Sequence, residues 1–175
     1  MTAQEREILE ALDAVLRKKS TAAILEQFVK RVERKLTLDP DALLAWEPVP
    51  LGSYGERLPE MIFSSWVFIL RAGSVTGAER HPNSHQRVVS YRGSGDLQVW
   101  RGDRWHSNHL VSDFEAPLER RWLSIPVNVW HQAVVPAENW VVVSFHTVPA
   151  DQLIEERPDP ADEKLTRQRR YLDVG

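Results

Sequence analysis

Three side chains that can bind a metal ion lie close together in the segment 73–85. Glu79, His81 and His85 occupy positions i, i+2 and i+6. In an extended strand alternate residues face the same side, so Glu79 and His81 project together, and a kink at Pro-Asn-Ser can return His85 to that side. A further histidine, His131, ends the short motif Pro-Val-Asn-Val-Trp-His. The spacing predicts an interior metal site.

Any metal in this protein must be held by nitrogen and oxygen atoms. The sequence contains no cysteine, which excludes disulfides, iron–sulfur clusters, thiolate zinc sites and cysteine nucleophiles. Neutral imidazoles and a carboxylate suit a divalent transition metal, and such a site can leave positions open to water or substrate. The composition therefore narrows the chemistry to a histidine and carboxylate site.

The composition is that of an ordinary globular protein. Hydrophobic residues make up 42% of the 175 positions, charged residues 27%, and the formal net charge is -3. This length fits one domain with short terminal additions. Seven tryptophans are a surplus for such a chain, and they predict a well-filled core or an aromatic-lined cavity.

The sequence also bears on location and partners. The first residues lack the basic start and apolar stretch of a signal peptide, and no apolar run approaches the ~18 residues of a membrane span. No helix-turn-helix with a basic recognition face is evident. We therefore expect a cytoplasmic protein with neither nucleic-acid nor membrane partners.

Apolar periodicity divides the chain into three parts. Residues 1–45 have helical spacing and predict an N-terminal extension of two helices. Residues 46–150 begin with a connector rich in Pro and Gly and continue with short strand-like runs separated by turns, which is typical of an antiparallel sandwich or barrel. Residues 151–175 predict a tail with a short helix and a charged end, solvated or flexible. The expected strands are 61–70, 87–91, 97–100, 121–125, 132–135 and 140–146.

The glycines, carboxylate and histidines resemble two sequence motifs of the cupin superfamily. The first motif of the family has a glycine, two histidines one residue apart, a carboxylate four residues on and a glycine turn; the second has a proline, a small turn residue and a histidine. The matching stretches here are Gly73-x5-Glu79-x-His81-x3-His85, Gly93-Ser-Gly95 and Pro126-Val-Asn128-Val-Trp-His131. The resemblance spans about 65–148 and implies a mainly β, cupin-like antiparallel β-barrel, or jelly roll, around one divalent metal.

The resemblance also implies a set of ligands. Glu79 falls on the family's first histidine, His81 on the second, His85 on the carboxylate and His131 on the last histidine. Three histidines and one carboxylate would then bind the metal. Compared with the family, the carboxylate stands at the first histidine position and a histidine stands at the carboxylate position. Asn128 stands where the second motif usually has glycine, and asparagine tolerates the left-handed backbone that the turn needs.

A second alignment is possible because one residue more than usual separates His85 from Gly93. Anchoring the alignment on Gly93 puts Gln86 at the carboxylate position, and Arg80 and Pro82 at the histidine positions. These three residues do not form a metal site, and one added residue in a loop costs little free energy. The alignment that keeps the histidines is therefore favoured.

Several side chains near the motifs are candidates for contacting a substrate. Either of two arginines among them would suit a carboxylate, because a guanidinium matches that group in a bidentate way. His106 and His109 have a spacing that can chelate, but we interpret them as loop residues near the barrel mouth. The substrate-contacting candidates are Arg71, Gln86, Arg87, Tyr91 and His146.

The implied site supports more than one function. A metal-dependent enzyme acting on a small organic molecule is expected, with a non-haem iron dioxygenase favoured and an isomerase or decarboxylase as an alternative. The rival is a non-catalytic cupin that binds a small ligand or mediates protein interactions. Iron is the favoured metal, although nickel, manganese, zinc and copper accept the same ligands. Glu79 could ligate the metal, orient a ligand or pair with an arginine, and the N-terminal helices could form a homodimer interface.

Overall fold

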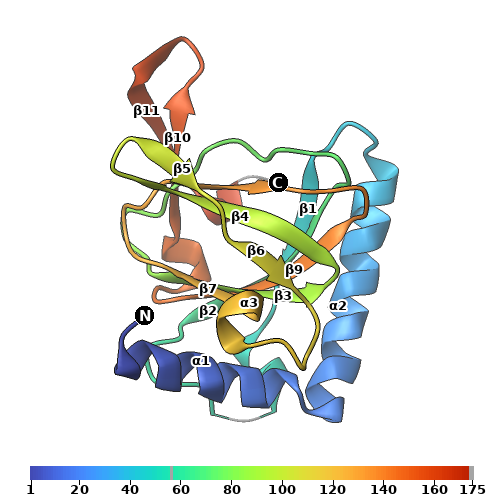
Figure 1. The fold of residues 1–175 in the computed structure, drawn as a ribbon. Coiled ribbons are helices and arrows are strands. Elements are labelled where there is room, and N and C mark those ends of the chain that lie inside the picture. The colour runs from blue at the N-terminus through green and yellow to red at the C-terminus, as the bar shows by residue number, and fades with distance from the viewer. Residues whose placement is uncertain (56, 174–175) are drawn as a thin grey trace.

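The computed structural model describes residues 1–55 and 57–173 and is mainly β, with two long helices before the strands (Figure 1). Its longer elements, in chain order, are α1 (Ala3–Leu16), α2 (Lys19–Leu38), β1 (Leu44–Pro48), β2 (Ser64–Leu70), β3 (Gln86–Arg92), β4 (Ser94–Arg101), β5 (Arg104–His106), β6 (His109–Val111), α3 (Leu118–Arg121), β7 (Trp122–Ile125), β8 (His131–Val134), β9 (Trp140–His146), β10 (Ile154–Asp159) and β11 (Asp162–Arg170). Short 3-10 turns lie at Leu51–Tyr54, Ala150–Gln152 and Tyr171–Asp173.

Two antiparallel sheets enclose the core. Sheet A has the strand order β1-β2-β9-β3-β7, and sheet B consists of β4 paired with β5, β6 and β8. Trp66, Phe68 and Val142 from sheet A pack with Leu97 and Val99 from sheet B in one buried cluster. Two packed antiparallel sheets of short strands are the architecture of a jelly roll, so the predicted mainly β fold is confirmed.

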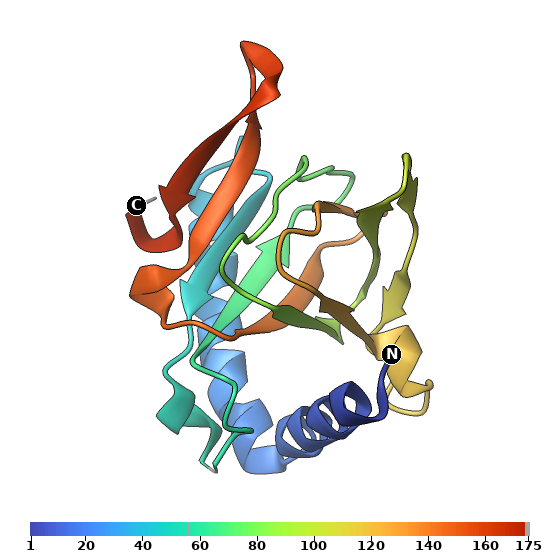
Figure 2. The same ribbon diagram turned by 90° about the vertical axis from the view of Figure 1, so that its left-hand side faces the viewer.

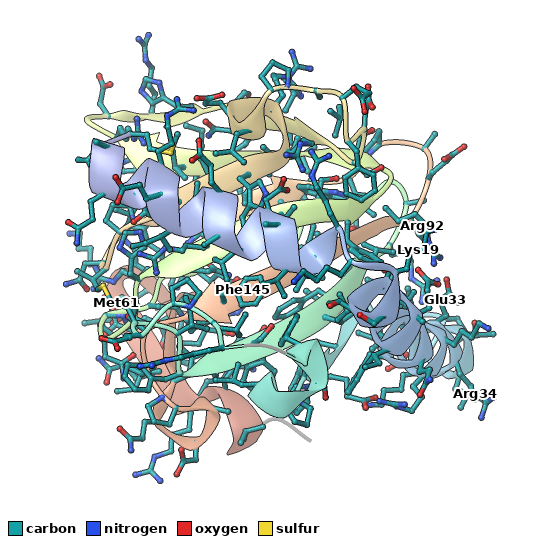
Figure 3. All side chains as sticks on the ribbon, turned by 90° about the horizontal axis from the view of Figure 1, so that it is seen from below. Lys19, Glu33, Arg34, Met61, Arg92 and Phe145 are labelled. Carbon is teal, nitrogen blue, oxygen red and sulfur yellow. The ribbon has the colours of Figure 1, made fainter. Side chains whose placement is uncertain are left out.

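The helices cover the other face of sheet A (Figure 2). The apolar faces of α1 and α2 join Val67, Val143 and Phe145 of sheet A in a second buried cluster. Figure 3 shows the polar sides of these elements at the periphery, where Arg92 pairs with Glu33 at 2.9 Å. The protein therefore has three layers, and the predicted pair of N-terminal helices is confirmed. Among the described residues no helix is both long and apolar enough to cross a membrane.

The tryptophan surplus is divided between core and surface. Trp66, Trp122 and Trp140 are buried, as a well-filled core requires, whereas Trp100 on β4 remains 39% exposed. A side chain on Gly95 would overlap the ring of Trp140, because a Cβ there would lie 2.1 Å from a ring carbon. Glycine at this position thus allows the largest side chain of β9 to lie flat between the sheets.

The C-terminal segment corrects the predicted helical tail. Beyond the turn at Ala150–Gln152, β10 and β11 form an antiparallel hairpin. The backbone N–H groups of Arg80 and Glu156 each donate to the other's carbonyl, at 3.0 and 2.9 Å. In a helix the carbonyl of Glu156 would lack its donor, because Pro160 has no N–H, whereas the extended pairing satisfies this carbonyl. The prediction of a connector at 46–55 is also partly wrong, because residues 46–48 belong to β1, which pairs with β2.

A buried ion pair fixes α1 to the sheet. The carboxylate of Asp13 accepts hydrogen bonds from Arg121 and from the indole Nε1 of Trp122, the latter at 2.9 Å. Nε of Arg17 donates a further hydrogen bond of 2.7 Å to the same carboxylate. Burial alone would raise the pKa of Asp13, but these donors hold it below its usual value. Because Arg121 is only 4% exposed, Asp13 is the partner that balances its buried charge.

Replacing Asp13 by alanine is expected to lower the free energy of unfolding by about 3 kcal/mol, because it leaves a buried guanidinium unpaired. Urea unfolding of the variant measures the loss. Glu10→Ala on the same helix is the control, since its side chain is 58% exposed and its contact with Arg6 is 4.0 Å long. Equal stabilities of the two variants would contradict this assignment.

Candidate metal centre

Glu79, His81 and His131 converge on one point inside the protein. One potential ligand atom from each lies within 4.8 Å of the others. Glu79 and His131 are held side by side by two backbone hydrogen bonds, from each N–H to the other's carbonyl, of 2.9 and 2.8 Å. His81 follows two residues after Glu79 on the same extended segment. The alternation expected from the sequence therefore places these three side chains together.

Backbone carbonyls fix the orientation of both imidazole rings. Nδ1 of His81 lies 3.0 Å from the carbonyl oxygen of Ile154, and Nδ1 of His131 lies 3.0 Å from that of Val129. A carbonyl only accepts, so in each neutral ring Nδ1 carries the proton and Nε2 has a free lone pair. Histidines that bind metals are commonly held in this way.

The lone pair of His131 has no hydrogen-bond partner. Its Nε2 is buried and unsatisfied, although Oε1 of Glu79 lies 3.4 Å away. An imidazole without a proton at Nε2 and a carboxylate both present lone pairs, so only a proton or a metal ion between them makes the contact favourable. Metal bonds of about 2.0–2.2 Å place ligand atoms at most ~4.4 Å apart, so small side-chain rotations would suffice. The residues present fit a divalent ion.

The surrounding charges keep the candidate ligands in metal-binding forms. Burial alone would raise the pKa of Glu79, but His131 and Arg157 lower it to about 2. Burial, together with the charge of His131, lowers the pKa of His81 to about 4. At neutral pH the carboxylate is thus ionised and His81 is neutral, which are the states that bind a metal.

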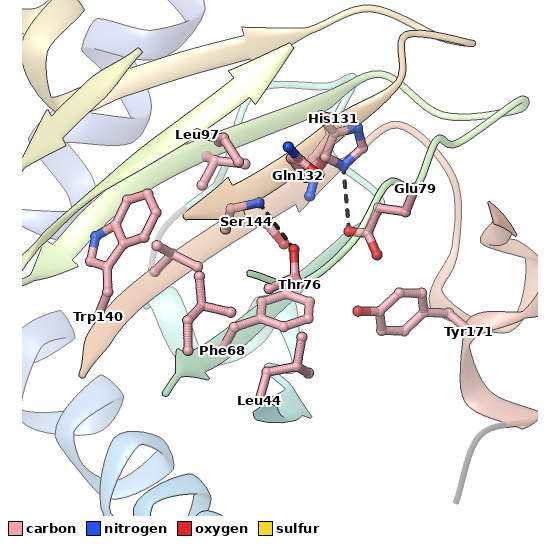
Figure 4. Close-up of a pocket in the computed structure, with 15 residues that line it drawn as sticks. Leu44, Phe68, Thr76, Glu79, Leu97, His131, Gln132, Trp140, Ser144 and Tyr171 are labelled. Carbon is pink, nitrogen blue, oxygen red and sulfur yellow. Dashed lines mark hydrogen bonds and ion pairs between the residues drawn. The ribbon is translucent and has the colours of Figure 1, made fainter. Parts of the chain in front are cut away.

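A small cavity adjoins Glu79 and His131. It has a volume of about 50 Å³ and its walls are mostly apolar, with Phe68, Val88 and Trp140 among the lining residues. Figure 4 shows Glu79 and Tyr171 at one end of this cavity. Cavities that bind drug-sized ligands measure ~300 Å³ or more. This one has room only for a few atoms beside a bound ion.

Tyr171 forms part of the wall of the cavity. Tyr171 is 6% exposed, and its ring centroid lies 5.1 Å from that of Trp66. Arg157 of β10 pairs with Glu79 and, at 2.5 Å, with Glu155. Neither role could be predicted from the sequence, because both residues stand in a charged segment without a motif. One sequence feature could have pointed to Tyr171: it is the sole aromatic residue after position 150.

His85 is placed away from the other predicted ligands, and the predicted set needs correction there. A turn at Pro82 and Asn83 changes the alternation, so the buried Ser84 points inward and His85 points toward α1. Nε2 of His85 lies 2.6 Å from Oγ of Ser124. The three converging residues therefore offer two histidines and one carboxylate.

Three of the predicted substrate contacts face away from the cavity. Arg87 donates two hydrogen bonds, of 2.7 and 2.8 Å, to the carboxylate of Glu5 on α1. Tyr91 on the same strand lies against α2, where its hydroxyl is 3.5 Å from the carbonyl of Ala22. Arg71 donates to carbonyls after the end of α2, including that of Asp39. Their positions correct these predictions and assign the residues to contacts between helices and sheet.

Gln86 and His146 lie on the inner face of sheet A. Gln86 lines the cavity, and its buried Oε1 has no hydrogen-bond partner. The ring of His146 lies between Ser84 and Ser144, at 3.3 and 3.2 Å, and its centroid is 5.1 Å from that of His81. Both residues are therefore placed to act near the candidate centre. His106 and His109 lie on β5 and β6 instead of in a loop.

The depressed pKa of His81 predicts a pH-dependent stability for the metal-free protein. The unfolded state takes up a proton near pH 6.5 and the folded state only near pH 4, so stability is lost as the pH falls through this range. Between pH 7 and pH 5 the loss from this group is about 2 kcal/mol. His146, whose pKa also lies well below its usual value because of burial, adds to it.

Urea unfolding at several pH values would measure this dependence. His81→Asn is expected to show a shallower decline than the unmodified protein, whereas His109→Asn, at an exposed position, keeps the full decline. The assignment fails if His81→Asn declines as steeply as His109→Asn.

Comparisons with known proteins give likeness in fold at low sequence identity. No protein-family model matches the sequence, and no curated protein matches it. Among solved structures, the capsular polysaccharide assembling protein CapF from Staphylococcus aureus has a TM-score of 0.49 and 14% identity, over 73% of this chain and 32% of that one. Oxalate oxidase in complex with glycolate has a TM-score of 0.46 and 12% identity, over 61% and 52%.

The oxalate decarboxylase of Lactobacillus farciminis gives a similar result. Its TM-score is 0.47 and its identity 11%, over 61% of this chain and 29% of that one. The chain thus spans about half or less of the length of these proteins. Likeness at this level says nothing about activity.

Proposed function

We propose that this protein binds one divalent transition metal, with iron(II) the favoured ion, through Glu79, His81 and His131. The observation that carries the proposal is the buried Nε2 of His131, which has no partner and faces a carboxylate. A buried polar atom without a partner costs about 1–3 kcal/mol, and a metal ion would remove this cost. The two carbonyl-bound Nδ1 atoms support the same conclusion, because they leave both Nε2 atoms directed away from the backbone.

The composition of the triad favours iron over its competitors. Two histidines and one carboxylate on one side of an ion are the ligand set of non-haem iron oxygenases, and they leave the other positions open. When bound, iron would supply the activation of dioxygen and of a small organic substrate. We therefore favour a dioxygenase acting on a small molecule, as the sequence suggests.

The residues around the cavity would position such a substrate. The free Oε1 of Gln86 would accept a hydrogen bond from a hydroxyl or amine. Phe68, Val88 and Val142 would exclude water from the reacting atoms. Because the cavity holds only about 50 Å³, a substrate larger than a few atoms requires Tyr171 to move out of its mouth.

A non-catalytic role is the competing proposal, and one contact favours it. The guanidinium of Arg157 neutralises Glu79, and Tyr171 covers the cavity. In that case the triad is an internal ion pair, and the protein binds a ligand or a partner elsewhere. The two proposals differ in whether Glu79 exchanges Arg157 for a metal.

Anaerobic titration calorimetry with iron(II) tests the metal site directly. We expect one ion per chain for the unmodified protein, and a loss of affinity of 100-fold or more for Glu79→Ala, His81→Ala or His131→Ala. His85→Ala is the matched control and should retain full affinity, because the ring of His85 contacts Ser124 and not the three proposed ligands. Cobalt(II) and zinc(II) titrations rank the competing metals. Undiminished binding in all three ligand variants would refute the site.

Substitution of Arg157 separates the two proposals. If Glu79 binds a metal, Arg157→Gln removes a competitor for its carboxylate and is expected to raise iron(II) affinity several-fold. If Glu79 instead stays paired with Arg157 and never binds a metal, the variant binds no metal and only loses stability. Arg167→Gln on β11 is the control, because Arg167 pairs with Asp159 at an exposed position.

A further inference from the structure

Three tryptophans form a row on the outer face of sheet B. Trp105 of β5 lies opposite Trp100 of β4 in the register of the sheet. On the other side, the N–H of Trp100 donates a hydrogen bond of 2.8 Å to the carbonyl of Trp130, which extends the pairing of β4 with β8 by one residue. Val99 and His131, one position along, are buried between the sheets, so the three indoles point to the opposite face. Trp100 is 39% exposed and the other two are half-buried.

The rings of this tryptophan row form an aromatic surface outside the core. The ring centroids of Trp100 and Trp105 lie 5.3 Å apart with an angle of 76° between the ring planes, so the two indoles make a corner. The guanidinium of Arg80 lies 4.6 Å from the ring centroid of Trp130 and holds that ring in place. Figures 1 and 2 show sheet B at the outside of the molecule, on the side away from α2. Core packing therefore does not account for these three tryptophans.

A chain of hydrogen-bonded polar side chains runs beside the tryptophan row on the same face. Nε2 of Gln98 donates to the carboxylate of Asp96 at 2.7 Å, and Nε2 of Gln132 donates to Oε1 of Gln98 at 2.9 Å. These bonds fix the orientation of both amides. Each amide keeps one N–H, and Gln132 keeps its Oε1, without a hydrogen bond in the described part of the chain. Fixed amides with free donors and a free acceptor suit hydroxyl groups, because a hydroxyl both donates and accepts.

A groove continues this surface at the other end of β4. It has a volume of about 290 Å³, and Asp96, His109, Val134 and Pro136 are among its lining residues. Asp96 precedes Trp100 by four residues, or about 13 Å along the strand. The surface thus runs from an aromatic corner across two amides to a groove, which is longer than one sugar ring. The carboxylate of Asp96 is already hydrogen-bonded within the protein, so the surface favours an uncharged ligand.

We propose that the outer face of sheet B binds a neutral oligosaccharide. The tryptophan row would stack on sugar rings, because the C–H groups on one face of a pyranose pack well against the negative face of an indole. Gln98 and Gln132 would bond the hydroxyls at the ring edges. A protein interface has a fully buried apolar core, whereas amides interrupt the apolar surface here. The surface lies on the other side of sheet B from His131, so this binding does not depend on a metal.

Titration calorimetry with cellohexaose, mannohexaose and N-acetylchitohexaose tests the proposal. At least one of the three is expected to bind, with the same affinity in the presence and absence of EDTA. Trp100→Ala and Trp105→Ala should each weaken that binding at least tenfold. Phe63→Ala is the matched control, because Phe63 is 54% exposed but precedes β2 of sheet A. No binding of any hexasaccharide, or equal affinities of these variants and the control, would overturn the proposal.

The nature of the contact has its own variants. Trp100→Phe keeps an aromatic face and should retain most of the affinity, whereas Trp100→Leu, which is apolar without such a face, should not. Gln132→Ala removes the free acceptor and is expected to weaken binding at least fivefold, while Gln27→Ala at an exposed position of α2 leaves it unchanged. Circular dichroism checks that each variant is folded.

Two other ligands can stack on tryptophan and serve as competitors. They are an oligothymidine and a proline-rich peptide, titrated under the same conditions. Binding of either one without binding of a hexasaccharide would contradict the proposal and assign the surface to that ligand instead.

Discussion

The reciprocal backbone hydrogen bonds between Glu79 and His131 are the contact on which the candidate centre depends. They join the segment after β2 to the start of β8, and so place the carboxylate of Glu79 beside Nε2 of His131, which has no hydrogen-bond partner. One residue further along, Arg80 makes the same kind of bridge to Glu156 and brings β10 into place. The two bridges together connect the ligand segment to sheet B and to the C-terminal hairpin.

The positions of side chains that follow a local pattern could be predicted from the sequence. Positions that depend on contacts distant in sequence could not. Alternation on a strand places Glu79 and His81 together, and Asn128 has the left-handed backbone, φ 62°, expected from the motif. His85 departs from the prediction because a turn shifts the alternation. Arg87 and Tyr91 differ because odd-numbered residues of β3 face the helices, and no local pattern reveals which face of a strand the helices cover.

The C-terminal hairpin could not be inferred from local propensity. Its charged residues find partners on other elements, as Arg157 does at Glu79 and Glu156 does at Arg80. Tyr171 is buried by contacts with Trp46 and Trp66, far away in sequence. The C-terminal segment therefore has two effects: β10 supplies the carbonyl of Ile154 that orients His81, and Tyr171, after β11, lines the cavity.

X-ray absorption spectroscopy of the iron(II)-loaded protein tests the central claim most directly, because it reports the atoms bound to the metal. The account predicts two imidazoles together with oxygen ligands at ~2.0–2.2 Å. It also predicts that one imidazole is lost in His131→Ala and none in His85→Ala. A spectrum without imidazole scattering, or one that His131→Ala leaves unchanged, would contradict it.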